Sequence, residues 1–375
     1  MEFLSIKNNL RKGLFIVSHI AGKNVNLPIL NNVMIEAEEG NIKLTTTDLE
    51  TGITHYLRGK TEKEGVFTVN SKMISDYINL LPDKKIKIKQ QKEELEIECE
   101  NYHTKIKGQS SEDFPLIPQV EKKEGYKTGI KEFKKALSRV VFAASTAESR
   151  AELNGILFSI NQNELTLVST DSYRLAEKKV KIENKNKNEK EVIVPAKTIQ
   201  ELLRILSGLG EDGEIKEEEE VDFFITENQI LFSTNSTELV SRLIEGQYPD
   251  YKQIIPNKSQ TKAKVDKNEL IRAVKTSSLF SKTGVNDINL DFPKEKNQII
   301  VSSTSGQTGE NIVKIDSQTQ GEDNRIIINY QYLLDNLKTI EEEEIEIKIT
   351  DSNTPCVITP IKEKDYLYII MPIKQ

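Results

Sequence analysis

Hydrophobic and polar residues follow one pattern along this chain, and this pattern occurs three times. Residues 3–22 place apolar residues at helical spacing, and residues 27–57 then alternate apolar and polar residues across short turns. The same order recurs over residues 128–178 and 263–315. We therefore predict that each repeat begins with an amphipathic helix followed by strands.

The second half of each repeat also recurs. A short apolar run, a polar or Pro residue suited to a helix N-terminus, a second amphipathic helix and further strands begin near residues 65, 191 and 325. Matching positions lie about 125–135 residues apart, which is the length of a domain rather than of a solenoid repeat. The predicted helices cover residues 5–20, 70–81, 130–145, 195–207, 266–282 and 329–340.

The joins between repeats are rich in Pro and polar residues, at 110–125 and 245–262. We therefore predict three domains, at 1–123, 124–252 and 253–375. Each is expected to be α+β, with two helices packed on antiparallel sheets of about eight short strands.

Composition indicates a soluble globular protein, with 37% hydrophobic and 30% charged residues in 375. No apolar run approaches the ~20 residues that span a membrane, and the first residues lack a secretory apolar core. The two cysteines match no metal-binding spacing. We expect a cytoplasmic, reduced protein without a metal site or cofactor.

Charge is distributed unevenly. The chain has a net charge of −7, yet the six predicted helices carry nine more basic than acidic side chains. Lys131, Lys135 and Arg139 recur every fourth residue and are predicted to line one helical face. A single basic stripe is usually a solvated face, but three repeats biased alike indicate nonspecific contact with nucleic-acid phosphates. The acidic runs at 211–220 and 340–347 should lie away from such a partner.

One polar turn, Ser169–Arg174 in "STDSYRL", has residue types that also occur in catalytic centres. No GxSxG elbow, phosphate-binding loop or clustered histidine accompanies it. The first repeat has Thr47-Asp48 where this one has Thr170-Asp171, so we interpret Thr-Asp as shared hairpin chemistry. A hydrolase remains an alternative only if a base lies near Ser169 or Ser172.

Taken together, "LPILNNVMIEAEEGNIKLTTTDLE", "ELNGILF", "STDSYRLA", "GQYPDYKQIIP" and "YIIMPIKQ" resemble the bacterial DNA polymerase III beta subunit family, the sliding clamps. The resemblance covers essentially the whole chain in order. It implies three clamp-type domains in a crescent, and two crescents that close head to tail into a ring around double-stranded DNA with helices lining the hole. It implies a non-catalytic processivity factor that binds the replicative polymerase, the clamp loader and repair proteins through short linear motifs.

The resemblance also implies three sets of functional residues. A peptide-docking pocket between domains 2 and 3 would use Leu153, Thr170, Ser172, Tyr173, Arg174, Leu175, Pro249, Gln253, Ile254, Asn329, Tyr332, Ile369, Ile370, Met371, Pro372 and Ile373. We expect Arg174 to form its rim, and Leu175, Ile254 and Met371 to form apolar walls. The DNA-facing set, taken from the charges on the helices, is Lys7, Arg11, Lys12, Lys72, Lys131, Lys135, Arg139, Arg150, Lys197, Arg204, Lys267, Arg272 and Lys275. The dimer interface would bring Ile106 against Leu279 and Phe280 of a second copy, although these three are also plausible core residues.

Three positions depart from the family pattern. Ser172-Tyr173 stands where many relatives have Gly-His, Gln253 stands where Arg is frequent, and the chain ends in Lys374-Gln375 rather than a basic-plus-aliphatic pair. These departures bear on which motifs the pocket prefers. A repeat scaffold that does not bind DNA is the competing function; it predicts that the basic helix faces do not converge.

Overall fold

The computed structural model describes residues 1–375 except 23–25, 124, 148, 185–188, 210–218, 283, 295 and 375. The chain forms two compact units. Unit 1 comprises Met1–Lys131, Glu183–Asn186 and Lys197–Leu243. Unit 2 comprises Glu132–Ile182, Lys187–Ala196 and Ile244–Gln375, so the second repeat is divided between the units.

The threefold repeat is confirmed element by element. The first repeat contains β1 (Glu2–Ile6), α1 (Lys7–Val17), β2 (Asn32–Glu38), β3 (Asn41–Thr47), β4 (Thr51–Arg58), β5 (Lys60–Lys63), β6 (Gly65–Asn70), α2 (Ser71–Leu80), β7 (Lys85–Gln91), β8 (Glu94–Cys99) and β9 (Tyr102–Gln109). The second contains β10 (Gly125–Gly129), α3 (Ile130–Val140), β11 (Gly155–Asn161), β12 (Glu164–Thr170), β13 (Arg174–Lys181), β14 (Glu183–Asn184), β15 (Lys190–Pro195), α4 (Ala196–Leu209), β16 (Glu220–Ile225), β17 (Gln229–Ser233) and β18 (Thr237–Arg242). The third contains β19 (Thr261–Asp266), α5 (Lys267–Ser278), β20 (Asp287–Phe292), β21 (Gln298–Ser305), β22 (Gly309–Gly321), β23 (Asn324–Asn329), α6 (Tyr330–Thr339), β24 (Glu344–Ile349), β25 (Cys356–Pro360) and β26 (Tyr366–Ile370).

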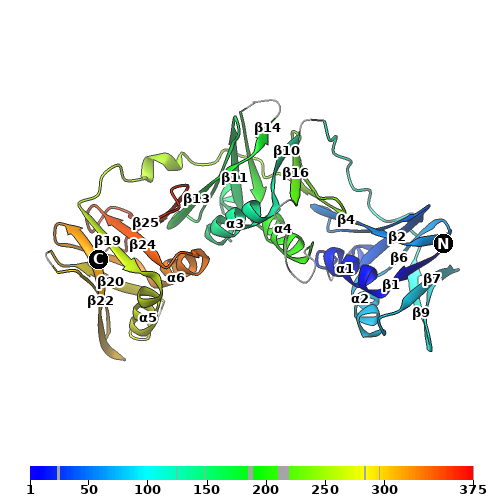
Figure 1. Ribbon diagram of the computed structural model, residues 1–375, viewed down its shortest axis with the longest axis horizontal. Helices are drawn as coiled ribbons and strands as arrows, with labels where there is room; N and C mark the ends of the chain where they lie inside the picture. The colour runs from blue at the N-terminus through cyan, green and yellow to red at the C-terminus, as the bar shows by residue number, and fades with distance from the viewer. Residues whose placement is uncertain are drawn as a thin grey trace. The chain divides into compact units, whose positions relative to one another are not determined.

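Each repeat begins with a strand, where the sequence led us to expect the first helix directly. The predicted helix 5–20 begins only at Lys7 and ends at Val17, because Glu2–Ile6 form β1 and pair with β7 and β5. In the same way β10 and β19 precede α3 and α5. Within each unit the helices lie together on one side of the sheets (Figure 1).

Lysine and asparagine side chains fix the helix ends in equivalent ways. Asn70 and Asn329 cap α2 and α6 by accepting a backbone N–H from Met73 and Gln331. Lys7, the first residue of α1, donates to the carbonyl of Leu81 after α2, and Lys267 of α5 donates to that of Ile340 after α6. In the first and third repeats, a lysine at the start of one helix thus binds a carbonyl left without a helical partner at the end of the other.

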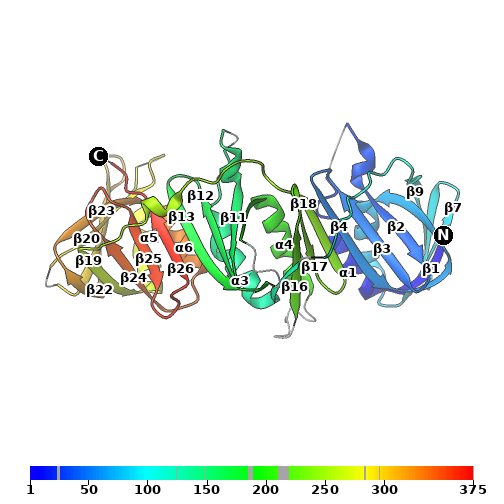
Figure 2. The ribbon, with the colours of Figure 1, turned by 90° about the horizontal axis from the view of Figure 1, so that it is seen from above.

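Two antiparallel strand pairs join successive repeats into continuous sheets, as Figure 2 shows. The β4–β18 joint, in unit 1, pairs Thr51–His55 with Thr237–Ser241. The β13–β26 joint, in unit 2, pairs Arg174–Lys178 with Tyr366–Ile370. By repeat equivalence β4 and β13 correspond to β22, whereas β18 and β26 correspond to β9. The chain thus uses the same joint twice.

Candidate functional site

The turn between β12 and β13 is held by Thr170 and Asp171. Thr170 Oγ1 donates to the Arg174 carbonyl at 2.6 Å and accepts from Ser172 N, while Asp171 Oδ1 accepts from the backbone N–H of Tyr173 and Arg174 at 2.9 and 3.0 Å. Thr47 and Asp48 make the same four bonds in the β3–β4 turn. The interpretation of Thr-Asp as shared hairpin chemistry is confirmed.

Ser172 lies at the one position of this turn that favours glycine. Its φ is +77°, and the equivalent Leu49 has φ +79°. Left-handed backbone costs a non-glycine residue about 1–2 kcal/mol. Ser172 therefore adopts this conformation at a local energetic cost, and its hydroxyl accepts from Arg150 Nη1 at 3.3 Å.

Arg174, which was expected at the rim of the pocket, acts as an internal brace. Its side chain is only 12% exposed; Nε donates to Asp171 at 3.0 Å and Nη1 to Asp335 at 2.8 Å. The guanidinium stacks over the ring of Tyr332 at 4.5 Å and also faces that of Phe142. These contacts lock the β12–β13 turn of the second repeat to α6 of the third.

Several of the predicted pocket residues are buried in or beside an apolar cluster beneath the turn. Leu153, Leu175 and Ile369 belong to it, and each is at most 2% exposed. Thr170 and Ile370 are buried as well. Leu175 is therefore core rather than an open wall, and these five residues support the site from below.

The exposed part of the predicted pocket comes from four short segments. Tyr173 is 64% exposed, Ser172, Pro249 and Gln253 are exposed, and Ile254, Asn329, Tyr332, Met371, Pro372 and Ile373 are half-buried. Met371 N donates to the Tyr173 carbonyl at 2.8 Å, so Met371 continues β26 along the turn. Ile373 N donates to the carbonyl of Ile327 in β23, also at 2.8 Å. Asn329 Oδ1 already accepts the backbone N–H of Gln331 as the cap of α6, and the side chain of Gln253 donates to Asp250.

Sequence reasoning missed the tyrosines that anchor the linker. Tyr248 and Tyr251 lie within the quoted "YPDYKQI" and pack in the same apolar cluster, beside Ile254 and Ile255. Burial raises the pKa of both phenols well above the ordinary value. The sequence signal that could have predicted their burial is their spacing of three residues in a segment rich in Pro.

The unit that contains this turn offers no histidine as a base for the hydrolase alternative. Ser169 is fully buried and donates to the Val140 carbonyl, and Ser172 accepts from Arg150. None of the chain's three histidines belongs to unit 2, which contains this turn.

The basic residues predicted to face DNA fall into different classes. The prediction that Arg139 faces DNA is wrong, because its side chain is 1% exposed, stacks on Tyr366 and lies 3.0 Å from Glu363. Arg150 is not on a helix and instead contacts Ser172. Arg204 is half-buried and donates to the carbonyls of Phe15 and Ile16 at the end of α1.

The other basic residues of that set lie closer to the surface. Lys7 and Lys267 cap helices, Lys135 pairs with Glu341 at 2.9 Å, Lys72 pairs with Asp76 and Arg272 with Glu269. Lys12 is half-buried and Lys131 exposed. Arg11, Lys197 and Lys275 are exposed and have no carboxylate partner among the described residues.

The three residues expected at the dimer interface also differ in how far they are exposed. The Ile106 side chain is 2% exposed and packs in the core of unit 1, so this side chain is not available to meet Leu279 or Phe280 of a second copy as expected. Leu279 is 73% exposed and Phe280 half-buried. On α2, Met73 and Leu80 are 57% and 82% exposed, an apolar stripe that sequence reasoning missed.

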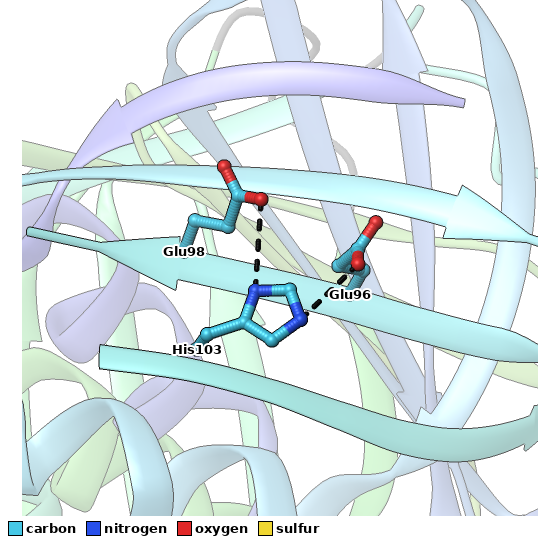
Figure 3. Close-up of side chains that lie close together, drawn as sticks. All are labelled: Glu96, Glu98 and His103. Carbon is cyan, nitrogen blue, oxygen red and sulfur yellow. Dashed lines mark ion pairs between the residues drawn. The ribbon is translucent and has the colours of Figure 1, made fainter. Parts of the chain in front are cut away.

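A cluster of Glu96, Glu98 and His103 also lies outside the predicted sites (Figure 3). Its ligand-type atoms all lie within 4.8 Å of one another, across the β8–β9 pair. However, His103 Nε2 faces Glu96 at 3.2 Å while Nδ1 faces Glu98 at 3.6 Å, and Lys105 Nζ shares Glu96 at 3.6 Å. The two ring nitrogens point to different carboxylates and a cation already occupies one of them, which is typical of a surface ion-pair ladder.

Three family models match the chain in order. They are the N-terminal, central and C-terminal domains of the DNA polymerase III beta subunit, over residues 1–118, 128–250 and 252–374. The beta sliding clamp of Staphylococcus aureus is 29% identical over 359 residues, which cover 93% of this chain and 92% of that protein.

Solved structures agree over the full length. The sliding clamp of Bacillus subtilis is 28% identical with a TM-score of 0.92, covering 100% of this chain and 99% of that one. A DNA polymerase III beta subunit from Thermotoga maritima is 28% identical with a TM-score of 0.91 over the same shares. Within the described part of the chain, no helix is long and apolar enough to cross a membrane.

Proposed function

This chain belongs to the DNA polymerase III beta subunit family and is a DNA sliding clamp, and we propose that two copies close into a ring through the joint that each copy already uses twice. The observation that carries the proposal is the pair of strand edges left without a partner. Tyr102–Lys107 of β9 pair only with β8, and Gly309–Asp316 of β22 pair only with β21, among the described strands. These are the equivalents of the strands that meet in the β4–β18 and β13–β26 joints.

Pairing β22 of one copy with β9 of the next would complete the series of joints. It would also cover Ile312 on β22, Leu279 after α5, and Met73 and Leu80 on α2, which are exposed in the single chain. Two such joints close a head-to-tail dimer. We further propose the domain bounds 1–123, 124–252 and 253–375, which the ranges of the three family models support.

Sedimentation velocity tests the ring directly. Leu80→Asp places a carboxylate in the proposed interface, so we expect this variant to sediment as a 42.7 kDa monomer while the wild type sediments as a dimer. Leu116→Asp is the matched control, because Leu116 is 96% exposed and lies in the linker. A monomeric wild type, or a Leu80→Asp variant that remains dimeric, would contradict the proposal.

The ring would hold DNA without reading its sequence. Arg11, Lys197 and Lys275 provide exposed cations on α1, α4 and α5, and phosphate contacts of this kind exchange freely as a protein slides. We expect the wild type to be retained on nicked circular DNA and released when the circle is linearised. Equal retention on both forms would mean that binding is not topological.

We propose that this clamp tethers polymerase, clamp loader and repair proteins in the cytoplasm and makes or breaks no bond itself. Support for docking at the β13–β26 joint comes from its apolar cluster, braced by Arg174 and edged by the half-buried Ile254 and Met371. A docked motif would be presented to the template at high effective concentration.

The docking proposal is tested with heptapeptides selected on the wild type from a random phage-displayed library. Met371→Asp should weaken their binding at least tenfold, because it puts a charge on the apolar edge of the site. Leu116→Asp again serves as the control. Unchanged affinity in Met371→Asp would place the peptides elsewhere.

A further inference from the structure

A hollow in the third repeat, next to the proposed docking site and lined by the linker and by β19, β24, β25 and β26, combines an apolar floor with lysines. We call it the lysine hollow; its volume is about 300 Å³. Ile255, Val357 and Leu367 contribute its apolar lining, and Lys258, Lys262 and Lys348 its charges. We propose that it binds acidic side chains that flank the apolar motif of a docked partner, an inference that rests on the docking function proposed above.

The hollow is continuous with the docking site through shared side chains. Val357 belongs to the apolar cluster that contains Leu175 and Ile369, and Ile255 and Leu367 pack against that cluster. Ile255 also follows Ile254 directly in the linker. Because Ile254 lies at the edge of the docking site and Ile255 lines the hollow, a peptide docked there would reach the hollow along the linker.

The lining of the hollow is positively charged without internal compensation. It contains three lysines and neither Asp nor Glu. Lys348 pairs with Glu346 at 3.0 Å, but Lys258 and Lys262 have no carboxylate partner among the described residues. The adjacent hollow on the same face differs, because Glu346 and Glu363 lie there among Lys264, Lys348 and Lys364.

The strand register adds an independent argument. Lys262 on β19 stands directly opposite Lys348 on β24, whereas Lys264 stands opposite Glu346. Like charges directly opposite each other on neighbouring strands are destabilising. Glu346 offsets the charge of Lys348 but not that of Lys262, so a carboxylate placed beside Lys262 and Lys348 would relieve this repulsion further.

The size of the hollow restricts what enters it. About 300 Å³ is at the lower limit of ligand pockets and admits only a few side chains. Its apolar floor suits the methylene groups of Glu and the backbone of a peptide better than a fully hydrated strand of nucleic acid. An acidic peptide segment is therefore the occupant that fits both charge and surface.

The experiment compares two tails on one docking peptide. The best heptapeptide from the library, selected at 0.5 M NaCl to suppress electrostatics, is synthesised with a Gly-Glu-Glu-Glu or a Gly-Gln-Gln-Gln tail at either end. Fluorescence anisotropy with the full chain at 50 mM NaCl gives the Kd of each. We expect the Glu tail, at one of the two ends, to tighten binding by about 5- to 30-fold, which corresponds to about 1–2 kcal/mol.

Variants locate the effect. Lys258→Gln combined with Lys262→Gln should reduce the advantage of the Glu tail to less than twofold and leave the affinity for the Gln-tailed peptide unchanged. Lys264→Gln is the matched control, because Lys264 lies on the same strand and face as Lys262 but opposite a carboxylate. All three lysines are exposed, so the variants should keep the wild-type circular dichroism spectrum.

The outcomes separate the two proposals. Binding of the core peptide with no preference for the Glu tail overturns this inference alone, as does a preference that Lys264→Gln abolishes equally. Failure of every library peptide to bind at the docking site overturns the docking function and this inference with it. Displacement of the Glu tail by a 20-nucleotide single strand, with affinity that depends on Lys258 and Lys262, would assign the hollow to nucleic acid instead.

Discussion

His55 makes the β4–β18 joint sensitive to acid. Its imidazole is 5% exposed, and Nδ1 lies 2.8 Å from the hydroxyl of Thr237, its partner across the joint. Burial, and secondarily the charge of Lys12, lower the pKa of His55 from 6.5 to about 4. The folded chain therefore keeps this ring neutral at pH values where the unfolded chain protonates it.

The sign and size of the effect follow from linkage. Because the folded pKa is depressed, stability is fully present above pH 6.5 and is lost as pH falls from 6.5 toward 4. Between pH 7 and pH 5 the loss is about 2 kcal/mol, and it approaches about 3 kcal/mol below pH 4.

Two measurements check this prediction. The chain has only three histidines, so NMR titration of ¹³C-labelled imidazoles should resolve one that stays neutral down to about pH 4. Urea unfolding followed by tyrosine fluorescence should show that His55→Gln, which retains a polar contact with Thr237, loses about 2 kcal/mol less than the wild type between pH 7 and pH 5. Lys12→Gln should reduce the loss partially, because it removes a charge that lowers the pKa. A His55→Gln variant with the full wild-type loss would refute the reasoning.

Three further predictions concern other positions. Glu363→Gln should destabilise unit 2 by about 3 kcal/mol or more in urea unfolding, because Glu363 faces both Arg139 and Lys178, each 1% exposed. Glu164→Gln is the control, because Glu164 pairs with the partly exposed Lys179; equal effects would contradict a special role for the buried cations. Ser172→Gly should stabilise the chain by about 1 kcal/mol by relieving its positive φ, and a lower melting temperature would contradict that account. Replacing Arg11, Lys197 and Lys275 by Gln should flatten the dependence of DNA affinity on salt, by about 0.9 in log–log slope for each phosphate that no longer meets a cation; an unchanged slope would mean that none of the three faces DNA.

The local pattern of apolar and capping residues predicted the helices well, but it did not predict the strands that precede the first helix of each repeat. Residues 70–81 and 329–340 were predicted as helices and are α2 and α6 within a residue or two, because an asparagine cap and apolar periodicity are both local. Residues 2–6 carry no such signal. They are a strand only because they pair with residues 85–89, about eighty positions further along the chain.

Arg139 shows why the site could be predicted only in part. Its spacing from Lys131 and Lys135 correctly places it on a helix, but Tyr366 and Glu363 of the third repeat cover that end of α3. The Thr170-Asp171 turn was predictable because the first repeat contains the same turn. The partner that fixes Arg174, Asp335, lies 161 residues away, and no local pattern reports such an ion pair.

If copies assemble as proposed, the edges of β9 and β22 that lack a partner among the described strands would make assembly a polymerisation with a terminating step. A copy added head to tail always leaves one free β9 and one free β22, so growth continues until the last edge meets the first. When two copies meet, the second joint forms within one complex, at an effective concentration in the millimolar range or above. Below that concentration, closure outruns the arrival of a third copy, and the same edges that would otherwise build filaments yield a product of fixed size.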